Sequence, residues 1–412
     1  MKKRILISGE YQAYTGFSCV VENIGKILCN DFDVTILDYS KNHGYIYKID
    51  NMVVAGKLFD GNTDKDTFGV KKLISVMENY DFIMLINDIW NIDEMLTEIR
   101  LSGKRIPKII VYFPIDAESH SAIWYKNMDI VSSAVTYTNY GKWVIEQAIT
   151  NEYSGFQKRE HIDNLLGKVA IIPHGINGND FFRINDEKWV RETLFKTDKY
   201  NKSYIVLNAN RNQPRKRLDI TISAFHLFIK NNPSIDAMLY LHSAIEDCHI
   251  NTYEFCKRLG ILDRIILSTN PDNPTQKPNM TTEQMNLIYN ACDVGINTSI
   301  GEGWGLCSFE HAFVGGVQIV PEHSACKEIY STKESELIVI DGYTIQDKIM
   351  TKASIPSIEN AAQLIEKLSS PSYRIKKREK TLDKFENKKH FWDEEIAIKW
   401  KKLIAKLSQE KI

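Results

Sequence analysis

Two acidic residues and several glycines lie close together in one stretch of the chain. Glu302 is part of the turn GEGWG, residues 301–305, and Glu310 follows eight positions after it. An apolar, strand-like run precedes the turn, and a helix is expected from about Leu306. The first N–H groups of such a helix have no partner inside it, so they offer donors and a positive dipole end to an anion. The stretch therefore predicts a phosphate-binding site.

The spacing of the two acids limits the chemistry that they could share. In a helix, their backbones would lie roughly 12 Å apart at about 1.5 Å per residue. Carboxyl pairs of glycoside hydrolases are separated by roughly 5 to 9.5 Å, so a hydrolytic pair is disfavoured. Beside a diphosphate, Glu302 and Glu310 are better suited to accept hydrogen bonds from sugar and ribose hydroxyls. The simpler alternative is a helix N-terminal acid and a solvated surface acid, which the glycines disfavour.

A basic loop could supply the matching positive charge. The predicted strand 204–207 is followed by NANRNQPRKR, with four cations within residues 211–217. Ligands of open parallel sheets bind beyond the carboxyl ends of the strands, where this loop begins. Arg211 can bind two oxygens at once and Lys216 is a mobile point charge, a pair suited to a leaving diphosphate. A solvated basic loop is the alternative, and both remain open.

Alternating strands and helices must position these residues. Apolar strand-like runs and amphipathic helices alternate along the chain, which predicts parallel sheets covered by helices on both faces. The predicted strands of the first half are residues 4–8, 34–37, 82–86, 108–113, 134–138 and 169–172. Those of the second half are residues 204–207, 237–241, 264–267, 293–297, 316–320 and 336–340. We therefore expect an α/β fold with two doubly wound, Rossmann-like domains facing across a cleft.

The length of 412 residues is too great for one ordinary core. We expect an N-terminal domain over residues 1–180, a C-terminal domain over residues 181–388 and a terminal helix over residues 389–412. Apolar residues of the tail fall on one helical face, so this helix is predicted to pack back on the first domain.

Composition bears on partners and location. The 52 Lys and Arg residues balance 53 acids, so no global field favours nucleic acid or an anionic membrane. No apolar run is long enough to span a membrane, and polar residues follow Ile7 too early for a signal peptide. Seven cysteines without C-x-x-C spacing suggest reduced thiols and a cytoplasmic protein. Peripheral membrane contact and a dimer are both compatible with the sequence.

The order of several motifs resembles family 4 retaining glycosyltransferases of the GT-B fold. The residues that carry the resemblance are IPHGINGNDFF at 172–182, Arg211-x4-Lys216, Ile288-Tyr289-x-x-Cys292-Asp293-Val294 and Glu302-x7-Glu310. The likeness is strong from about residue 169 to 330, weaker before it and compatible with the tail. General likeness also suggests a virus-encoded member, with chlorella viruses as one source.

The resemblance implies a nucleotide-sugar donor bound by the second domain and a glycan, lipid or protein acceptor approached from the first. It implies that Arg211 and Lys216 bind the diphosphate, that Glu302 contacts the sugar and that Glu310 holds the ribose hydroxyls. Backbone N–H groups near the sugar or phosphate would come from Gly303, Trp304, Gly305 and Leu306. The loop at residues 268–271, with Asn270, would lie beside the base.

Two features of the first domain are implied by the same resemblance. Gly16 and Phe17 open the first helix, as does the family's glycine-rich loop near the donor phosphate, although this chain has one glycine there. The N–H donors of the helix start survive that loss. His120 matches the histidine that many members place near the donor sugar, and a structural histidine is the alternative.

GDP-mannose is the expected donor, because residues 214–216 resemble those of mannosyltransferase members, and a UDP-sugar is the alternative. No metal and no other cofactor is expected. Because leaving-group electrostatics would supply much of the catalysis, Lys216→Ala should lose turnover far more than fold.

Three competing hypotheses remain. A metal-dependent GT-A transferase would use a D-x-D pair, and residues 31–33 and 64–66 have that form. A phosphorylase-like enzyme would require a pyridoxal phosphate lysine, which the sequence does not identify. A non-catalytic nucleotide-sugar or glycan-binding protein could retain the fold, although Arg211, Lys216 and Glu302 are all present.

Overall fold

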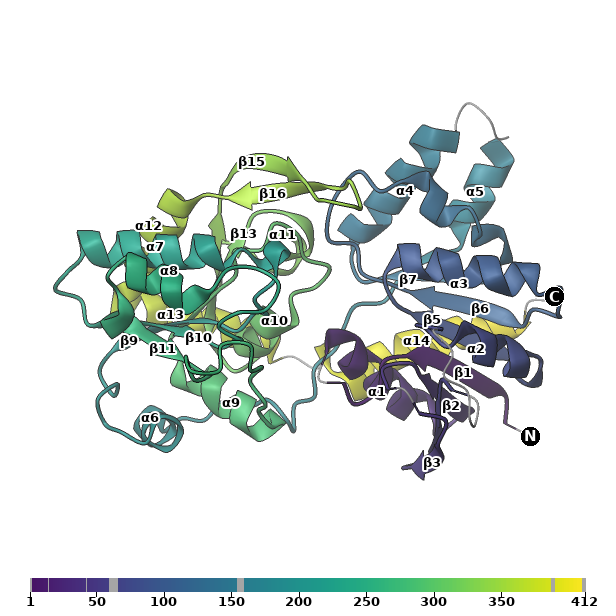
Figure 1. Ribbon diagram of the computed structural model, residues 1–412, viewed down its shortest axis with the longest axis horizontal. Coiled ribbons are helices and arrows are strands. Elements are labelled where there is room, and N and C mark those ends of the chain that lie inside the picture. The colour runs from purple at the N-terminus through teal and green to yellow at the C-terminus, as the bar shows by residue number, and fades with distance from the viewer. Residues whose placement is uncertain are drawn as a thin grey trace. The chain divides into compact units, whose positions relative to one another are not determined.

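The computed structural model describes residues 2–13, 15–41, 43–58, 66–153, 159–386 and 390–409. The chain forms two compact units (Figure 1). Unit 1 comprises residues 1–115, 119–175 and 389–412, and unit 2 comprises residues 116–118 and 176–388. Each unit is a Rossmann-like α/β body built on its own parallel sheet.

Unit 1 contains an eight-stranded sheet in the order β3-β4-β2-β1-β5-β6-β7-β8. All neighbouring strands are parallel except β3 and β4. The strands are β1 (Arg4–Gly9), β2 (Asp33–Asp38), β3 (Ile46–Ile49), β4 (Met52–Gly56), β5 (Phe82–Ile86), β6 (Lys108–Tyr112), β7 (Ser133–Thr136) and β8 (Val169–Ile171). The central strand β5 is buried along its whole length, as its continuous apolar sequence requires.

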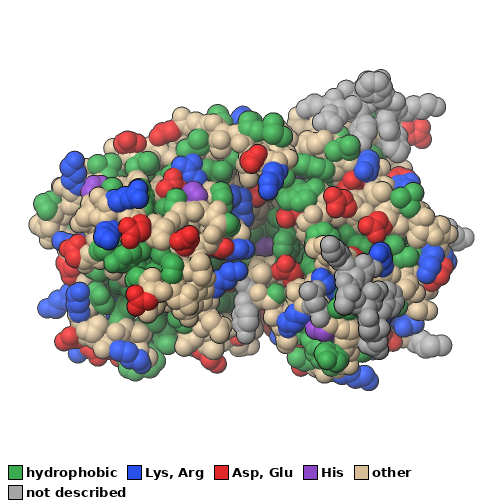
Figure 2. Space-filling view, in the orientation of Figure 1, with side chains coloured by type: hydrophobic (Ala, Val, Ile, Leu, Met, Phe, Trp, Pro, Cys, Tyr) green, Lys and Arg blue, Asp and Glu red, His purple; other side chains and the backbone are tan. Residues whose placement is uncertain are grey.

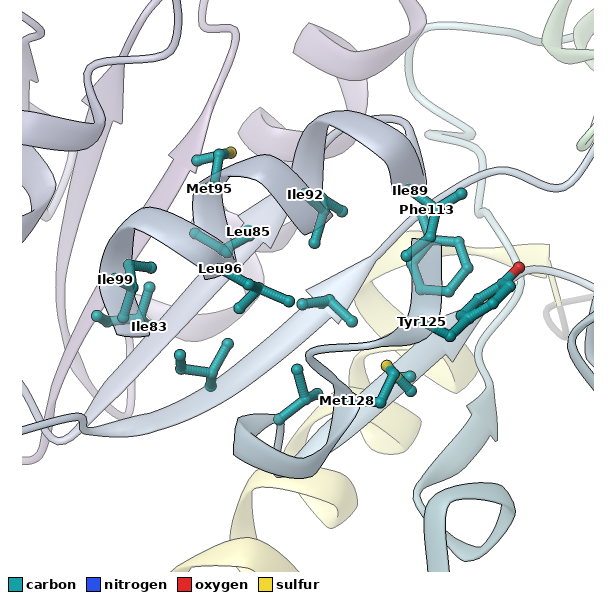
Figure 3. Packing of buried hydrophobic residues seen from close by; sticks show 14 of the residues in the cluster. Ile83, Leu85, Ile89, Ile92, Met95, Leu96, Ile99, Phe113, Tyr125 and Met128 are labelled. Atoms are coloured by element: carbon teal, nitrogen blue, oxygen red, sulfur yellow. The ribbon is translucent and has the colours of Figure 1, made fainter. Parts of the chain in front are cut away.

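Helices cover this sheet and complete its core. They are α1 (Gly16–Leu28), α2 (Val70–Val76), α3 (Ile89–Leu101), α4 (Asn139–Tyr153) and α5 (Arg159–Gly167), with short 3-10 turns at Met77–Asn79, Ala122–Tyr125 and Met128–Ile130. Helix α3 turns Ile92, Leu96 and Ile99 toward the sheet, at the spacing of one helical face (Figure 3). These residues pack with Ile83 and Leu85 of β5 in one buried cluster.

The C-terminal segment completes unit 1. A π-helical turn, Trp392–Ile396, leads into α14 (Ala397–Gln409). Trp400 is fully buried, with its ring edge-to-face on Tyr112 of β6 at a centroid distance of 5.0 Å. Trp392 packs so closely on Gly175 that a Cβ there would lie 2.7 Å from the indole ring. The prediction that the terminal helix packs back on the first domain is therefore confirmed.

Unit 2 contains a six-stranded parallel sheet in the order β11-β10-β9-β12-β13-β14 and a separate antiparallel pair, β15 and β16. The strands are β9 (Tyr204–Asn208), β10 (Ala237–Leu241), β11 (Ile265–Leu267), β12 (Val294–Ile296), β13 (Val317–Pro321), β14 (Glu336–Ile338), β15 (Ile340–Ile345) and β16 (Lys352–Pro356). Tyr204 and Val206 belong to one buried cluster, while Ile205 and Leu207 belong to another. Both faces of the sheet are therefore covered, as doubly wound folds require.

The helices of unit 2 lie between and after its strands. They are α6 (Glu187–Phe195), α7 (Leu218–Asn231), α8 (Thr252–Arg258), α9 (Thr282–Ala291), α10 (Leu306–Phe313), α11 (Ser324–Ile329), α12 (Ile358–Ser369) and α13 (Pro371–Phe385), with 3-10 turns at Pro214–Lys216 and Leu262–Arg264. On the face of unit 2 in Figure 2, acidic and basic side chains are interspersed. Among the helices described, none is long and apolar enough to cross a membrane.

Four strands were not among those predicted from the sequence. They form two antiparallel pairs, β3 with β4 and β15 with β16. Exposed and half-buried residues alternate along β3 and β15. Neither strand therefore needs the continuous apolar run of a strand that is buried on both faces. The turn between β3 and β4 places Asp50 in the left-handed region at φ +50°, which short polar residues tolerate.

Candidate functional site

The glycine-rich turn lies at the carboxyl edge of the sheet of unit 2. It follows β12 and ends at Gly305, whose backbone is left-handed at φ +84° and ψ +58°. Helix α10 then begins at Leu306, as the sequence predicts, and its first turn closes when Phe309 N–H donates to the Gly305 carbonyl at 3.0 Å. The N–H groups before Phe309 in this helix have no intrahelical acceptor. The turn can therefore present them to an anion.

Glu302 is buried inside this turn, with 3% of its surface exposed. Its Oε1 accepts hydrogen bonds from Lys216 Nζ at 2.5 Å, Asn297 Nδ2 at 3.0 Å and Ser299 Oγ at 2.8 Å. Burial alone would raise the pKa of Glu302, but the positive charges of Lys216 and Arg215 and these hydrogen bonds lower the pKa to about 2. Glu302 is thus a fixed anion at neutral pH.

Arg215 is the second cation that contacts Glu302. Its Nη1 lies 3.3 Å from Glu302 Oε2 and donates to the Gly301 carbonyl at 2.5 Å. Its Nε lies 3.2 Å from Asp116 Oδ2. The loop chemistry had favoured Arg211 as the partner of Lys216, and the four cations within seven residues were the available signal for Arg215.

Arg211 has a different carboxylate partner in the structure. It forms a two-pronged pair with Asp247, in which Nη2 and Oδ1 are 3.1 Å apart. The Arg211 side chain is 51% exposed, whereas that of Lys216 is 12% exposed. Lys216 and Glu302 are therefore brought together, and Arg211 is held on Asp247.

Ser324 also supports the turn and was not singled out from the sequence. Its Oγ accepts a hydrogen bond from Glu302 N–H at 3.2 Å and lies 2.9 Å from His323 Nδ1. Its backbone is left-handed at φ +47°, which is costly for a residue with a Cβ. The strained residue thus contacts the residue that carries the buried carboxylate. No local sequence pattern predicts this left-handed backbone at Ser324.

Glu310 lies on α10, eight residues beyond Glu302. Tyr289 of α9 donates its hydroxyl to Glu310 Oε2 at 2.7 Å. Burial and the negative charge of Asp180 raise the pKa of Glu310 to about 7, against the lowering effect of the Tyr289 hydrogen bond. The carboxyl therefore titrates near neutral pH and gains full acceptor capacity only when it is ionised.

Asn270 lies in the exposed turn after β11. Its Oδ1 accepts a hydrogen bond from Asp272 N–H at 3.0 Å, and its carbonyl accepts from Asn273 N–H at 3.0 Å. These bonds order the loop for which the resemblance implies a place beside the base. Gly303 and Trp304 complete the buried turn before Gly305.

The predicted residues of unit 1 lie at two places in that unit. Gly16 and Phe17 form the first turn of α1, which Thr15 caps by accepting from Ser18 N–H at 3.1 Å. His120 is buried, with Nδ1 2.9 Å from the Tyr125 hydroxyl and its ring edge-to-face on Trp124. These contacts fix the imidazole, as either a structural or a catalytic histidine requires.

The two D-x-D motifs lie at different places in unit 1. Asp33 begins β2, and Asp31 pairs with Lys401 of α14 at 2.7 Å. Residues 64 and 65 of the second motif lie outside the described residues. Over the described residues, no group of three His, Cys, Asp or Glu side chains could hold a metal ion.

Comparisons with solved structures identify the fold. Sucrose-phosphate synthase from Thermosynechococcus elongatus matches with a TM-score of 0.68 at 13% identity, over 99% of this chain and 99% of that chain. A UDP-forming α,α-trehalose-phosphate synthase from Burkholderia xenovorans matches with a TM-score of 0.68 at 12% identity, over 100% of both chains. HepE from Anabaena in complex with UDP-glucose matches with a TM-score of 0.64 at 13% identity, over 97% of this chain and 100% of that chain.

The chain therefore has the architecture of GT-B glycosyltransferase structures, with two Rossmann-like bodies. Neither the comparison with protein-family profiles nor that with curated protein sequences gives a match. At identities of 11–14%, the structural likeness establishes the fold and leaves activity to be argued from the site.

Proposed function

We propose that this protein is a retaining, metal-independent glycosyltransferase that moves a sugar from a nucleotide-sugar to a glycan, lipid or protein acceptor. The observation that carries the proposal is the buried Lys216–Glu302 pair immediately before the N-terminus of α10. A fixed anion, a shielded ammonium group and a helix N-terminus suit a ligand that combines hydroxyls with a diphosphate. The likeness to two sugar-phosphate synthases supports the same reaction class.

A UDP-sugar is favoured over GDP-mannose as the donor. One similar structure contains UDP-glucose, and another similar protein is described as UDP-forming. The preference for GDP-mannose rested on residues 214–216 alone, whereas these likenesses cover nearly the whole chain. We therefore correct the expected donor to a UDP-sugar, with GDP-mannose as the alternative to be tested.

Lys216 and α10 would stabilise the departing diphosphate. An ammonium group has three donors, and Lys216 uses one on Glu302. The other two donors of Lys216 and the N–H groups at the start of α10 could bind the same diphosphate, where negative charge develops as the sugar bond breaks. Glu302 Oε1 accepts from Lys216, Asn297 and Ser299, whereas Oε2 accepts from Arg215 Nη1 at 3.3 Å. A carboxylate oxygen has two lone pairs, so Oε2 keeps acceptor capacity for a sugar hydroxyl.

The remaining predicted residues take their roles from the resemblance. Arg211 would move from Asp247 to the diphosphate, a change that its half-exposed side chain permits. Glu310 would hold the ribose hydroxyls, and Asn270 would lie beside the base. The resemblance assigns donor contacts to His120 and to the start of α1 at Gly16 and Phe17 as well.

Calorimetric titration tests the proposal directly. Wild-type protein is titrated with UDP, UDP-glucose, GDP and GDP-mannose, first with EDTA and then with Mg²⁺. We expect UDP to bind with EDTA present and Glu310→Ala to weaken that binding by about tenfold, the effect of losing hydrogen bonds to a charged acceptor. The matched control is Glu366→Ala, which removes an exposed carboxylate from α12.

Release of UDP from UDP-sugars tests catalysis. Lys216→Ala should abolish release while the variant still unfolds cooperatively. Binding of GDP-mannose but not UDP would restore the original donor, and binding without turnover with any acceptor would indicate a non-catalytic binding protein. If no nucleotide binds, or if Lys216→Ala turns over at the wild-type rate, the proposal is wrong.

A further inference from the structure

Residues 116–118 form a crossing segment that belongs to unit 2, although Ile115 before it and Ser119 after it belong to unit 1. Its backbone is held by β16: Glu118 N–H donates to the Lys352 carbonyl at 3.1 Å, and Lys352 N–H donates to the Glu118 carbonyl at 3.0 Å. The Lys352 ammonium also lies 3.4 Å from the Glu118 carboxylate. The crossing segment is therefore an ordered part of unit 2.

The first residue of the crossing segment lies against the glycine-rich turn. The Asp116 carbonyl approaches Gly301 so closely that a Cβ at residue 301 would lie 2.4 Å from it. The Asp116 carboxylate lies 3.2 Å from Arg215 Nε. Asp116 thus contacts both the start of the turn and the cation that supports it.

Arg215 joins Asp116 to the buried carboxylate of the site. Its Nη1 reaches the Gly301 carbonyl and Glu302, and its own carbonyl accepts from Ile300 N–H at 2.9 Å. The Arg215 side chain is 30% exposed, so it could adopt other rotamers if one of its carboxylate partners were removed. A planar guanidinium held on two sides is fixed in direction as well as in place.

We propose that Asp116 is a positioning residue of the donor site, which holds Arg215 on Gly301 and Glu302 and so fixes the turn at residues 301–305. The expected effect on kcat rests on the proposed function, whereas the expected effect on the order of the turn does not. A partly exposed ion pair contributes little to global stability, so a role limited to stability would leave the turn and turnover unchanged. The role proposed here is local order in the turn.

Hydrogen exchange tests this local role without any substrate. Amide exchange of peptides covering residues 300–306 is compared in wild type, Asp116→Ala and the matched control Glu118→Ala. The control shortens a carboxylate of the same segment and leaves its backbone bonds to β16 in place. We expect exchange in the turn to accelerate at least about fivefold in Asp116→Ala only, with recovery in Asp116→Glu. Equal exchange in Asp116→Ala and wild type would overturn the inference.

Kinetics provide the second measurement. Removing the negative charge of Asp116 favours binding of an anionic nucleotide, whereas a loosened turn disfavours the reaction. We therefore expect kcat for UDP release to fall about tenfold in Asp116→Ala, while Kd for UDP weakens by less than about twofold. If kcat is unchanged in Asp116→Ala, the inference is contradicted. If UDP still binds in that case, the proposed function stands. If wild type binds no nucleotide, the proposed function fails and the exchange experiment alone decides the inference.

Discussion

At the scale of single residues, Glu302 and Glu310 have similar chemistry but opposite environments. Glu302 contacts two cations, Arg215 and Lys216. Its pKa lies near 2, so it is ionised at all ordinary pH values. Glu310 has a phenol and a nearby acid as neighbours, and its pKa lies near 7. One carboxylate is a permanent charge, and the other changes its protonation state in the physiological range.

The first prediction concerns the pH dependence of nucleotide binding. Ionised Glu310 accepts hydrogen bonds without donating any, so UDP affinity should increase as pH rises through about 7. Titration calorimetry from pH 5.5 to 8.5 measures this profile. In Glu310→Gln the increase should disappear, and a profile identical to that of wild type would show that another group controls binding.

Tyr289→Phe refines this test, because it removes only the hydroxyl that donates to Glu310. The midpoint of the binding profile should shift to higher pH, since the ionised carboxylate loses a donor. Tyr204→Phe is a matched control, which removes a buried hydroxyl bonded to the Ile365 carbonyl. A shift of equal size in both variants would contradict the assignment.

The same two carboxyls have opposite effects on stability. The raised pKa of Glu310 means that the folded state binds this proton more tightly than the unfolded state does. Protonated Glu310 therefore adds to the free energy of unfolding at low pH, and this stabilisation is lost as pH rises from about 4.5 through about 7. The lowered pKa of Glu302 contributes stability above about pH 4.5, which is lost as pH falls toward about 2. Protonation of Glu302 should therefore contribute to acid unfolding, together with other carboxyls whose pKa is lowered, such as Asp219 and Glu336.

At the scale of elements, the turn from β12 to α10 depends on Gly305. A Cβ at this position would meet only ordinary contacts, the nearest being Asn297 Nδ2 at 3.8 Å. The left-handed backbone, rather than lack of space, is therefore the reason for glycine. A β-branched or bulky residue would favour a different backbone and turn the first N–H groups of α10 away from the proposed anion site.

The second prediction compares Gly305→Ala with Gly260→Ala. Gly260 is also left-handed, at φ +70°, and a Cβ there would meet nothing within 4 Å. Both variants should lose about 1–2 kcal/mol of unfolding free energy, measured by denaturant titration. Only Gly305→Ala should weaken UDP binding, by about tenfold. Equal UDP affinity in the two variants would exclude the start of α10 as the phosphate-binding site.

At the scale of the whole molecule, the chain passes between its two units more than once. Unit 1 contains residues from both ends of the sequence, and unit 2 includes a three-residue crossing segment. Helix α14 closes unit 1 with Trp400, whose ring is buried against Tyr112. The stability of unit 1 therefore depends on residues at the far end of the chain.

The third prediction follows from this arrangement. Trp400→Ala should destabilise unit 1 by about 3–5 kcal/mol, because it leaves a large cavity. Ile398→Ala on the same helix is the control, since Ile398 is 46% exposed. Calorimetry should show a lower Tm for unit 1 in Trp400→Ala, while UDP affinity at 20 °C stays unchanged. Loss of UDP binding in the folded variant would show that α14 contributes to the donor site.

The sequence by itself determined the α/β architecture, the return of the terminal helix and the strand–turn–helix around Glu302. These features depend on apolar periodicity, on helix amphipathicity and on glycines at fixed offsets, all of which are properties of neighbouring residues. Most of the parallel strands were found because their apolar runs are continuous. Strands β3 and β15 were missed because exposed residues alternate with half-buried ones along them. Strand β16 has no continuous apolar run, whereas β4, which pairs in parallel with β2, was missed although its sequence MVVAG is apolar.

Only the tertiary structure decided which side chains meet around the buried carboxylate. Four cations within residues 211–217 look equivalent in sequence, but the 3-10 turn at Pro214–Lys216 directs Arg215 and Lys216 to Glu302. Asp116 reaches Arg215 from a segment far away in the chain. Such contacts depend on side-chain direction and on how distant segments fold together, and no local spacing encodes either.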